Sequence, residues 1–205
     1  MKIVAAMVVS ILLIGLGVLT AYIEAEAPSR HESLGGAGQA KALVLYHPSR
    51  DAGFSDDLSM AFADGLKLAG LAVERATLTS ATPASPKGYA LVAVVSNTYW
   101  WTPDLPTLRY LDRARLDSIP VVALIGGAGA TGRSQRVLEE ALGRTGAKVL
   151  AARSFWLWRP NDEARMNETN RTVALDMARR LGLDIGATLA GPASRAPAAA
   201  MVRPG

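Results

Sequence analysis

Short apolar segments alternate with helical patterns through the middle of the chain, and this alternation limits the possible folds more than any other feature. The apolar segments cover residues 42–46, 71–78, 89–95, 120–125 and 147–158. The third and fourth are unbroken apolar runs rich in valine, which is typical of strands buried on both faces of a parallel sheet. Strands that alternate with helices in this way predict an α/β fold with helices on both faces of the sheet.

The charges in these segments indicate the order of the strands. The second strand contains Glu74 and Arg75, which favours a position at the edge of the sheet, whereas the third and fourth contain no charge. Right-handed crossovers leave few arrangements of five parallel strands. We therefore expect a five-stranded parallel sheet of order 2-1-3-4-5 in a domain that spans residues 41–185.

The composition excludes several kinds of site. The chain has no cysteine, which excludes disulfides, thiolate metal sites and cysteine nucleophiles. His31 and His47 are too few for a histidine metal site. The net charge of +4 is not gathered into a basic run, so nucleic-acid binding is not expected.

The N-terminal segment is apolar enough to cross a membrane. Residues 3–23 carry no charge and are long enough to span a hydrocarbon core. A cleaved signal peptide is the alternative, but its apolar core is usually about 7–15 residues long, and the one Ala-x-Ala site, at 25–27, is followed by Pro28. We expect residues 1–26 to be a retained single-pass anchor in a bacterial inner membrane. The side on which the soluble domain lies stays open, because few Lys and Arg residues flank the span.

Two further segments lack a periodic apolar pattern. Residues 27–40 combine Pro, Ser, Gly and charged residues and are expected to form a linker, in which His31 is a solvated side chain. The last helix is expected to run from about 169 to 181 and to be closed by Gly182. Ala, Pro and Gly dominate afterwards, so we expect residues 186–205 to be a disordered tail.

Polar and aromatic residues follow the third strand. They are Ser96, Asn97, Thr98, Tyr99, Trp100 and Trp101. In open α/β sheets ligands bind beyond the carboxyl ends of the strands, and polar groups beside flat aromatic side chains suit a planar heterocyclic ligand. The alternative is that the aromatic residues only cover the top of the core.

The loop after the first strand contains a second candidate stretch. It includes Ser49, Arg50, Gly53, Phe54 and Ser55. Ser55 is expected to cap the following helix. The backbone N–H groups of a helix N-terminus attract a phosphate, and hydroxyls and an arginine add contacts. A lone loop histidine such as the neighbouring His47 is more often a surface residue than a catalytic one.

A glycine-rich loop follows the fourth strand and completes a pattern of three loops. It contains Gly126, Gly127 and Gly129, and glycine lets a ligand approach the backbone closely. Together, the three loops resemble those of the flavodoxin-like FMN-binding family, which includes NAD(P)H-dependent reductases. The resemblance covers residues 41–182. It implies that the FMN phosphate lies at the first loop, and that the ring lies between residues 96–101 and the glycine-rich loop.

The resemblance implies a membrane-anchored FMN-binding oxidoreductase that takes hydride from NAD(P)H and reduces a quinone or a similar small acceptor. Because the flavin carries the hydride, no catalytic side chain or metal is required. One alternative is a flavodoxin-type electron carrier, although carriers of that family are typically acidic. Another is a non-catalytic interaction module that has lost FMN, which the extra Asp51 and Ala52 in the first loop support.

Aromatic residues also end the last strand. Trp156 and Trp158 alternate with Phe155 and Leu157, so one pair faces the core and the other faces outward or a partner. The sequence therefore leaves open whether the protein forms a homodimer.

Overall fold

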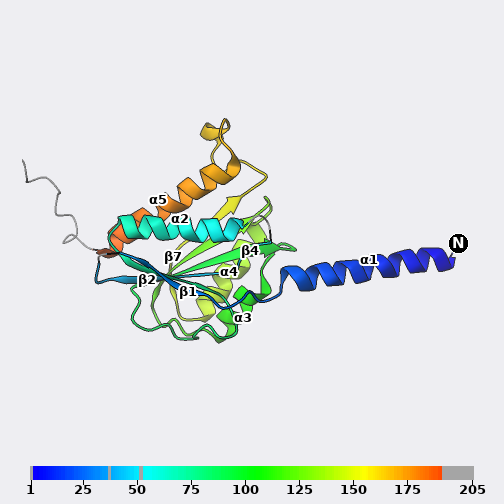
Figure 1. Cartoon of the computed structure of the whole chain (residues 1–205), viewed down its shortest axis with the longest axis horizontal. Helices are drawn as coiled ribbons and strands as arrows, with labels where there is room; N and C mark the ends of the chain where they lie inside the picture. The colour runs from blue at the N-terminus through cyan, green and yellow to red at the C-terminus, as the bar shows by residue number, and fades with distance from the viewer. Residues whose placement is uncertain (1, 37, 51–52, 191–205) are drawn as a thin grey trace, which may run out of the picture.

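A mostly parallel sheet forms the centre of the protein, and one long N-terminal helix projects from it (Figure 1). The computed structural model describes residues 2–36, 38–50 and 53–190. Its elements are α1 (Lys2–Ile23), β1 (His31–Gly35), β2 (Lys41–Tyr46), α2 (Phe54–Leu68), β3 (Ala72–Thr77), β4 (Leu91–Tyr99), β5 (Thr102–Pro103), α3 (Leu105–Arg113), β6 (Pro120–Gly127), α4 (Gly132–Arg144), β7 (Lys148–Trp156), the 3-10 turn η1 (Glu163–Arg165) and α5 (Asn170–Ala190).

The five parallel strands lie in the order β3-β2-β4-β6-β7. This is the expected order 2-1-3-4-5. The expectation of a wholly parallel, five-stranded sheet was wrong, however, because two antiparallel strands extend it. β1 pairs with the outer side of β3, and the short β5 pairs with the end of β4.

β1 corrects the prediction that residues 27–40 form only a linker. His31 lies opposite Ala76 and Gly35 opposite Val73, so the backbone of β3 is paired on both sides. β3 is therefore not an edge strand. No apolar period marks β1 in the sequence because most of its residues are exposed. His31 is exposed but not free, since its Nε2 lies 3.0 Å from Oε2 of Glu74.

Helices cover both faces of the sheet, as predicted. α2 and α5 pack on one face, and α3 and α4 pack on the other (Figure 1). Alternate residues of β2 enter the two cores, with Val44 facing α2 and Leu45 facing the opposite layer. The connection between β3 and β4 contains no helix and crosses the second face as an irregular loop.

α5 is longer than expected, and glycines let it lie very close to α2. It continues through Gly182 to Ala190, so the expected helix stop and the expected disorder of residues 186–190 were both wrong. A Cβ atom on Gly182 would lie 2.2 Å from the carbonyl oxygen of Phe62, and one on Gly65 would lie 2.0 Å from that of Arg179. These glycines serve helix packing. Residues 191–205 of the expected tail lie outside the described residues.

α1 agrees with the predicted apolar segment. Among the described residues it is the helix that is long and apolar enough to cross a membrane, a property that signal sequences share. None of its residues is buried against the domain.

Candidate functional site

A cavity of about 180 Å³ lies at the carboxyl edge of the sheet. It is lined by Ser49, Phe54, Asn97, Thr98, Tyr99, Gly126, Gly127, Ala128, Leu157 and Trp158. These residues follow or end β2, β4, β6 and β7, and the strand order reverses between β2 and β4. Open α/β sheets bind ligands at this position.

Three aromatic side chains line the cavity. Phe54 begins α2, Tyr99 ends β4, and Trp158 follows β7 with 79% of its surface exposed. The hydroxyl of Tyr99 accepts a hydrogen bond of 3.2 Å from the backbone N–H of Arg50, and burial raises the pKa of Tyr99 above its ordinary value. The phenol is therefore neutral at physiological pH. Flat apolar walls of this kind suit a planar ligand.

A buried carboxylate holds the end of β4 in place beneath the cavity. Oδ2 of Asp104 accepts hydrogen bonds from Oγ of Ser96 at 3.0 Å and from the backbone N–H of Asn97 at 2.7 Å. Oδ1 of Asp104 caps α3 by accepting from the backbone N–H of Thr107 at 2.9 Å. Ser96 and Asp104 are both fully buried, so Ser96 supports the site without reaching into it.

Ser55 has a similar supporting role. Its hydroxyl donates to the carbonyl oxygen of His47 at 2.6 Å and accepts from the backbone N–H of Ser49 at 2.7 Å. Gly53, with φ of 73°, occupies the N-cap position of α2, and the backbone N–H of Ser55 in the first turn donates to Oγ of Ser49 at 3.3 Å. The prediction that Ser55 is the N-cap was therefore wrong. Asp51 and Ala52 lie outside the described residues.

His47 is fully buried, which contradicts the expectation of a surface residue. Its Nε2 lies 3.1 Å from the carbonyl oxygen of Ala25, and its carbonyl oxygen accepts from Nδ2 of Asn97 at 2.8 Å. Nδ1 lies 3.5 Å from Oδ1 of Asp104. His47 thus joins the residues that follow α1 to the floor of the site, and the topology that places Ala25 there is not visible in the sequence.

Trp100 and Trp101 occupy a hairpin turn outside the cavity. β4 does not end at residue 95 as expected, but continues to Tyr99 and pairs there with β5. Trp100 and Trp101 have φ of 50° and 60°, a conformation that hairpin turns usually give to Asn or Gly. Such backbone strain is of the order of 1–3 kcal/mol per residue and is often found at functional positions. The two side chains are 47% and 59% exposed.

The structure thus divides the predicted site residues into two groups. Those that line the cavity are Ser49, Phe54, Asn97, Thr98, Tyr99, Gly126 and Gly127. Those that do not line it are Arg50, Gly53, Ser55, Ser96, Trp100, Trp101 and Gly129. Gly129 lies beside Arg159, whose Nη1 donates to its carbonyl oxygen at 3.4 Å. Trp158 was missed, although the alternating aromatic residues at the end of the last strand contained a signal for it.

Thr98 has an unused polar atom at the cavity. Its Oγ1 is buried and forms no hydrogen bond with any residue that the structure describes. Buried polar atoms are nearly always paired, so an unpaired hydroxyl on a residue that borders the cavity is unusual.

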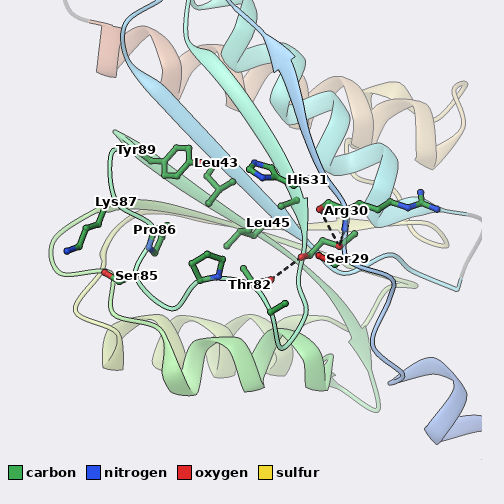
Figure 2. A pocket seen from close by; sticks show the side chains of 14 residues that line it. Ser29, Arg30, His31, Leu43, Leu45, Thr82, Ser85, Pro86, Lys87 and Tyr89 are labelled. Carbon is green, nitrogen blue, oxygen red and sulfur yellow. Dashed lines mark hydrogen bonds between the residues drawn. The ribbon is translucent and has the colours of Figure 1, made fainter.

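A larger cleft of about 430 Å³ lies under the loop between β3 and β4 (Figure 2). Leu43 and Leu45 form its floor, and Lys87 and Arg30 at its rim point away from it. The cleft exists because no helix covers this part of the sheet. It lies on the face of the sheet and presents no inward charge, so the smaller cavity at the carboxyl edge is the better candidate site.

Comparisons with known proteins agree with this architecture. No protein-family model matches the sequence, and no curated protein sequence matches it. Among solved structures, a flavodoxin from the domain Archaea has a TM-score of 0.56 and 18% identity, over 73% of this chain and 98% of that chain. The fold is flavodoxin-like.

Two further solved structures with a similar fold are named as enzymes. The NAD(P)H:quinone oxidoreductase from Methanothermobacter marburgensis has a TM-score of 0.52 and 20% identity, over 72% of this chain and 100% of that chain. An azoreductase from Bacillus anthracis str. Sterne has a TM-score of 0.52 and 14% identity, over 71% and 99% of the respective chains. At these identities the similarity establishes the fold alone.

Proposed function

We propose that this protein is a membrane-anchored, FMN-binding oxidoreductase that uses NAD(P)H to reduce a quinone or a similar small acceptor. The observation that carries the proposal is the cavity at the switch point of the flavodoxin-like sheet, with its aromatic walls and the unpaired hydroxyl of Thr98. The known redox enzymes with this fold add support.

The residues around the cavity fit the planar end of FMN. Tyr99, Phe54 and Trp158 supply apolar surfaces, and Oγ1 of Thr98 supplies a polar contact. Whole ligands usually occupy cavities of about 300–1,000 Å³, so a cavity of about 180 Å³ accommodates only part of FMN. The phosphate end then belongs outside the cavity, at the loop that precedes α2.

The N-terminus of α2 suits that phosphate electrostatically. Oγ of Ser49 accepts from the backbone N–H of Ser55 in the first turn, and the other N–H groups of this helix end, together with the helix dipole, attract anions. Asp56 and Asp57 lie in the first turn, but each is paired with an arginine, Arg75 and Arg171 respectively. Their negative charge is therefore largely neutralised. Arg50 in the same loop is a cation suited to the phosphate.

FMN, when bound, supplies the hydride and electron transfer. The chain has to hold and orient the ring and exclude water around it, and it needs no acid, base or nucleophile for that task. Asn97 and Thr98 are suited to orient a polar ring edge, and Tyr99 and Trp158 are suited to cover the ring. An electron carrier is the alternative, and NADH or NADPH oxidation by the FMN-loaded protein separates the two functions.

The structure adds a reason for retaining the anchor. Cleavage after Ala27 would remove Glu24, whose Oε2 accepts from the backbone N–H of Leu105 at 2.6 Å. It would also remove the carbonyl oxygen of Ala25, which contacts the buried His47. Both residues are part of the folded domain, so we include α1 in the mature protein.

Titration of the purified full-length protein with FMN tests the proposal. Flavin fluorescence should be quenched on binding, and Tyr99→Ala or Trp158→Ala should weaken the affinity roughly ten- to hundredfold, because base–aromatic stacking contributes about 1–3 kcal/mol. Arg50→Gln should weaken FMN more than riboflavin, which lacks the phosphate. Trp100→Ala and Trp101→Ala should leave the affinity nearly unchanged, because neither residue lines the cavity.

The controls are thermal unfolding curves for each variant, because a loss of binding is informative only in a folded protein. A strong effect of Trp100→Ala or Trp101→Ala would support the arrangement predicted from the sequence instead. If the well-folded wild-type protein binds no FMN at high micromolar concentration, the oxidoreductase proposal is wrong and the interaction-module alternative replaces it.

A further inference from the structure

Five residues of the domain, together with Tyr22 in the last turn of α1, form a surface where the domain meets α1. They are Tyr22, Arg50, Trp100, Trp101, Leu105 and Arg109, and we call them the hairpin surface. We propose that this surface docks on the phospholipid headgroup layer of the bilayer that α1 crosses. The inference rests on the anchor role of α1 in the proposed function, and it does not depend on FMN.

The domain cannot move freely on a linker after α1. The backbone N–H of Glu24 continues the helix by donating to the carbonyl oxygen of Thr20 at 3.0 Å. The side chain of Glu24 then binds the N-terminus of α3 through Leu105, and the next residue, Ala25, contacts the buried His47. Two successive residues after the apolar helix are therefore fixed to the domain. A bilayer around α1 has to end close to α3.

The composition of the hairpin surface matches a membrane interface. Trp100 and Trp101 expose large aromatic side chains at the tip of the β4–β5 hairpin, and tryptophan and tyrosine are enriched at the headgroup level of membrane proteins. In Figure 1 the carboxyl end of β4 points to the same side of the domain as α1. Leu105, at the start of α3, adds a 41% exposed apolar side chain.

Two arginines lie on the surface, and Arg109 is the one available to a lipid phosphate when Arg50 binds the FMN phosphate. The guanidinium of Arg50 lies over the ring of Tyr22 in the last turn of α1, 4.8 Å from its centroid. Arg109 lies in a groove of about 670 Å³ between α1 and α3, whose α1 side contributes Leu13 and Leu16. Neither arginine forms an ion pair with a residue in the described parts of the chain. A phospholipid would match this groove with an acyl chain along Leu13 and Leu16 of α1 and its headgroup phosphate near Arg109.

Docking would place the candidate site next to the bilayer. Tyr99 lines the cavity, and its hydroxyl accepts from the backbone of Arg50, whose side chain contacts Tyr22 of α1. Arg50 therefore contacts both a residue that lines the cavity and a residue of α1. A lipid-soluble acceptor would reach the site without crossing the aqueous phase.

Tryptophan quenching in membranes tests the inference. The full-length protein is placed in vesicles of phosphatidylcholine and phosphatidylglycerol, with or without lipids brominated near the headgroup. Trp158→Phe retains Trp100, Trp101 and the partly buried Trp156. The added changes Trp100→Phe and Trp101→Phe leave only Trp156 and measure the background. Adding Leu68→Trp to that background variant supplies a matched exposed tryptophan at the far end of α2, where Leu68 is 69% exposed.

We expect the emission of Trp100 and Trp101 to be blue-shifted and quenched several-fold more by bromolipid than that of the tryptophan at position 68. Equal quenching, in a protein that resists alkaline extraction from the vesicles, would overturn the docking while leaving the anchor intact. A protein that is extracted would overturn the anchor and the docking together. FMN titration of the wild-type protein in the same vesicles, in which Trp158 is unchanged, reports on the flavin proposal separately.

Discussion

At the residue scale, Glu24 controls the junction between α1 and the domain. Its buried carboxylate accepts a hydrogen bond of 2.6 Å from the backbone N–H of Leu105. Burial raises the pKa of Glu24 above its ordinary value, and the nearby Asp104 raises it further, whereas the hydrogen bond, His47 and Arg109 oppose the increase. Burial outweighs the stabilising contacts, so the charged carboxylate is less stable in the folded protein than in the unfolded chain.

This shift predicts a pH dependence with a definite sign. Because the folded-state pKa is higher than the unfolded value of 4.5, the contribution of Glu24 to stability is fully present below pH 4.5 and is lost as the pH rises through the raised pKa. Glu24→Gln keeps a carbonyl acceptor for Leu105 and has no ionisation to lose. Thermal unfolding in detergent should show the variant gaining stability relative to the wild type from pH 4.5 to pH 8. A difference that does not vary with pH would contradict the assignment.

Arg75 shows that a charged residue within a strand is not enough to predict that the strand lies at the edge of the sheet. In mid-strand it indicated an edge strand, yet its side chain is only 4% exposed. Its guanidinium is paired with Glu32 of β1 and Asp56 of α2 and lies 4.0 Å from the ring centroid of Tyr46. Partners from three other elements compensate the buried charge, and none of them is near Arg75 in the sequence.

At the element scale, the contact between α2 and α5 depends on residues that have no side chain. Gly65 on α2 and Gly182 on α5 remove the volume that would keep the two backbones apart. Glycine disfavours a helix interior by about 1 kcal/mol relative to alanine. The close packing of the two helices against the sheet offsets that cost. Gly182 therefore indicates a helix end when it is interpreted from its local sequence, but in the folded protein it allows the contact between α5 and α2.

Gly182→Ala should destabilise the protein by about 1–3 kcal/mol or more, the usual range for overpacking, because the new Cβ would lie 2.2 Å from the carbonyl oxygen of Phe62. Gly143→Ala on α4 is the matched control. Nothing lies within 4 Å of its added Cβ, so this change should stabilise the protein by up to about 1 kcal/mol. Denaturant unfolding measures both variants. Similar effects of the two substitutions would show that α2 and α5 are not packed through Gly182.

At the scale of the whole molecule, the apolar helix, the hairpin and the candidate cavity lie at one end of the domain. The contacts of Glu24 and Ala25 hold that arrangement. The cleft under the β3–β4 loop is larger but lies on the face of the sheet (Figure 2). The candidate cavity, and not the larger cleft, therefore lies beside the end of α1.

The proposal that α1 is retained as a membrane anchor predicts a result at this scale. Mass spectrometry of the protein extracted from membranes should find the N-terminal segment intact, because signal cleavage would remove contacts that the folded domain uses. A mature soluble protein that begins near Pro28 would rule out the anchor and the docking of the hairpin surface. The flavin proposal would survive that result, since the cavity contains no residue of α1.

The sequence by itself determined the α/β class, the order of the five parallel strands and much of the cavity lining, because apolar periodicity and strand ends are local properties. Only the tertiary structure showed that residues 31–35 form a strand, that His47 is buried and that Trp158, not Trp100 or Trp101, lines the cavity. β1 has no apolar period and needs the free edge of β3. The turn at Trp100 is set by the pairing of β4 with β5. Both are decided by pairing between backbone segments, which side-chain patterns within a short window do not record.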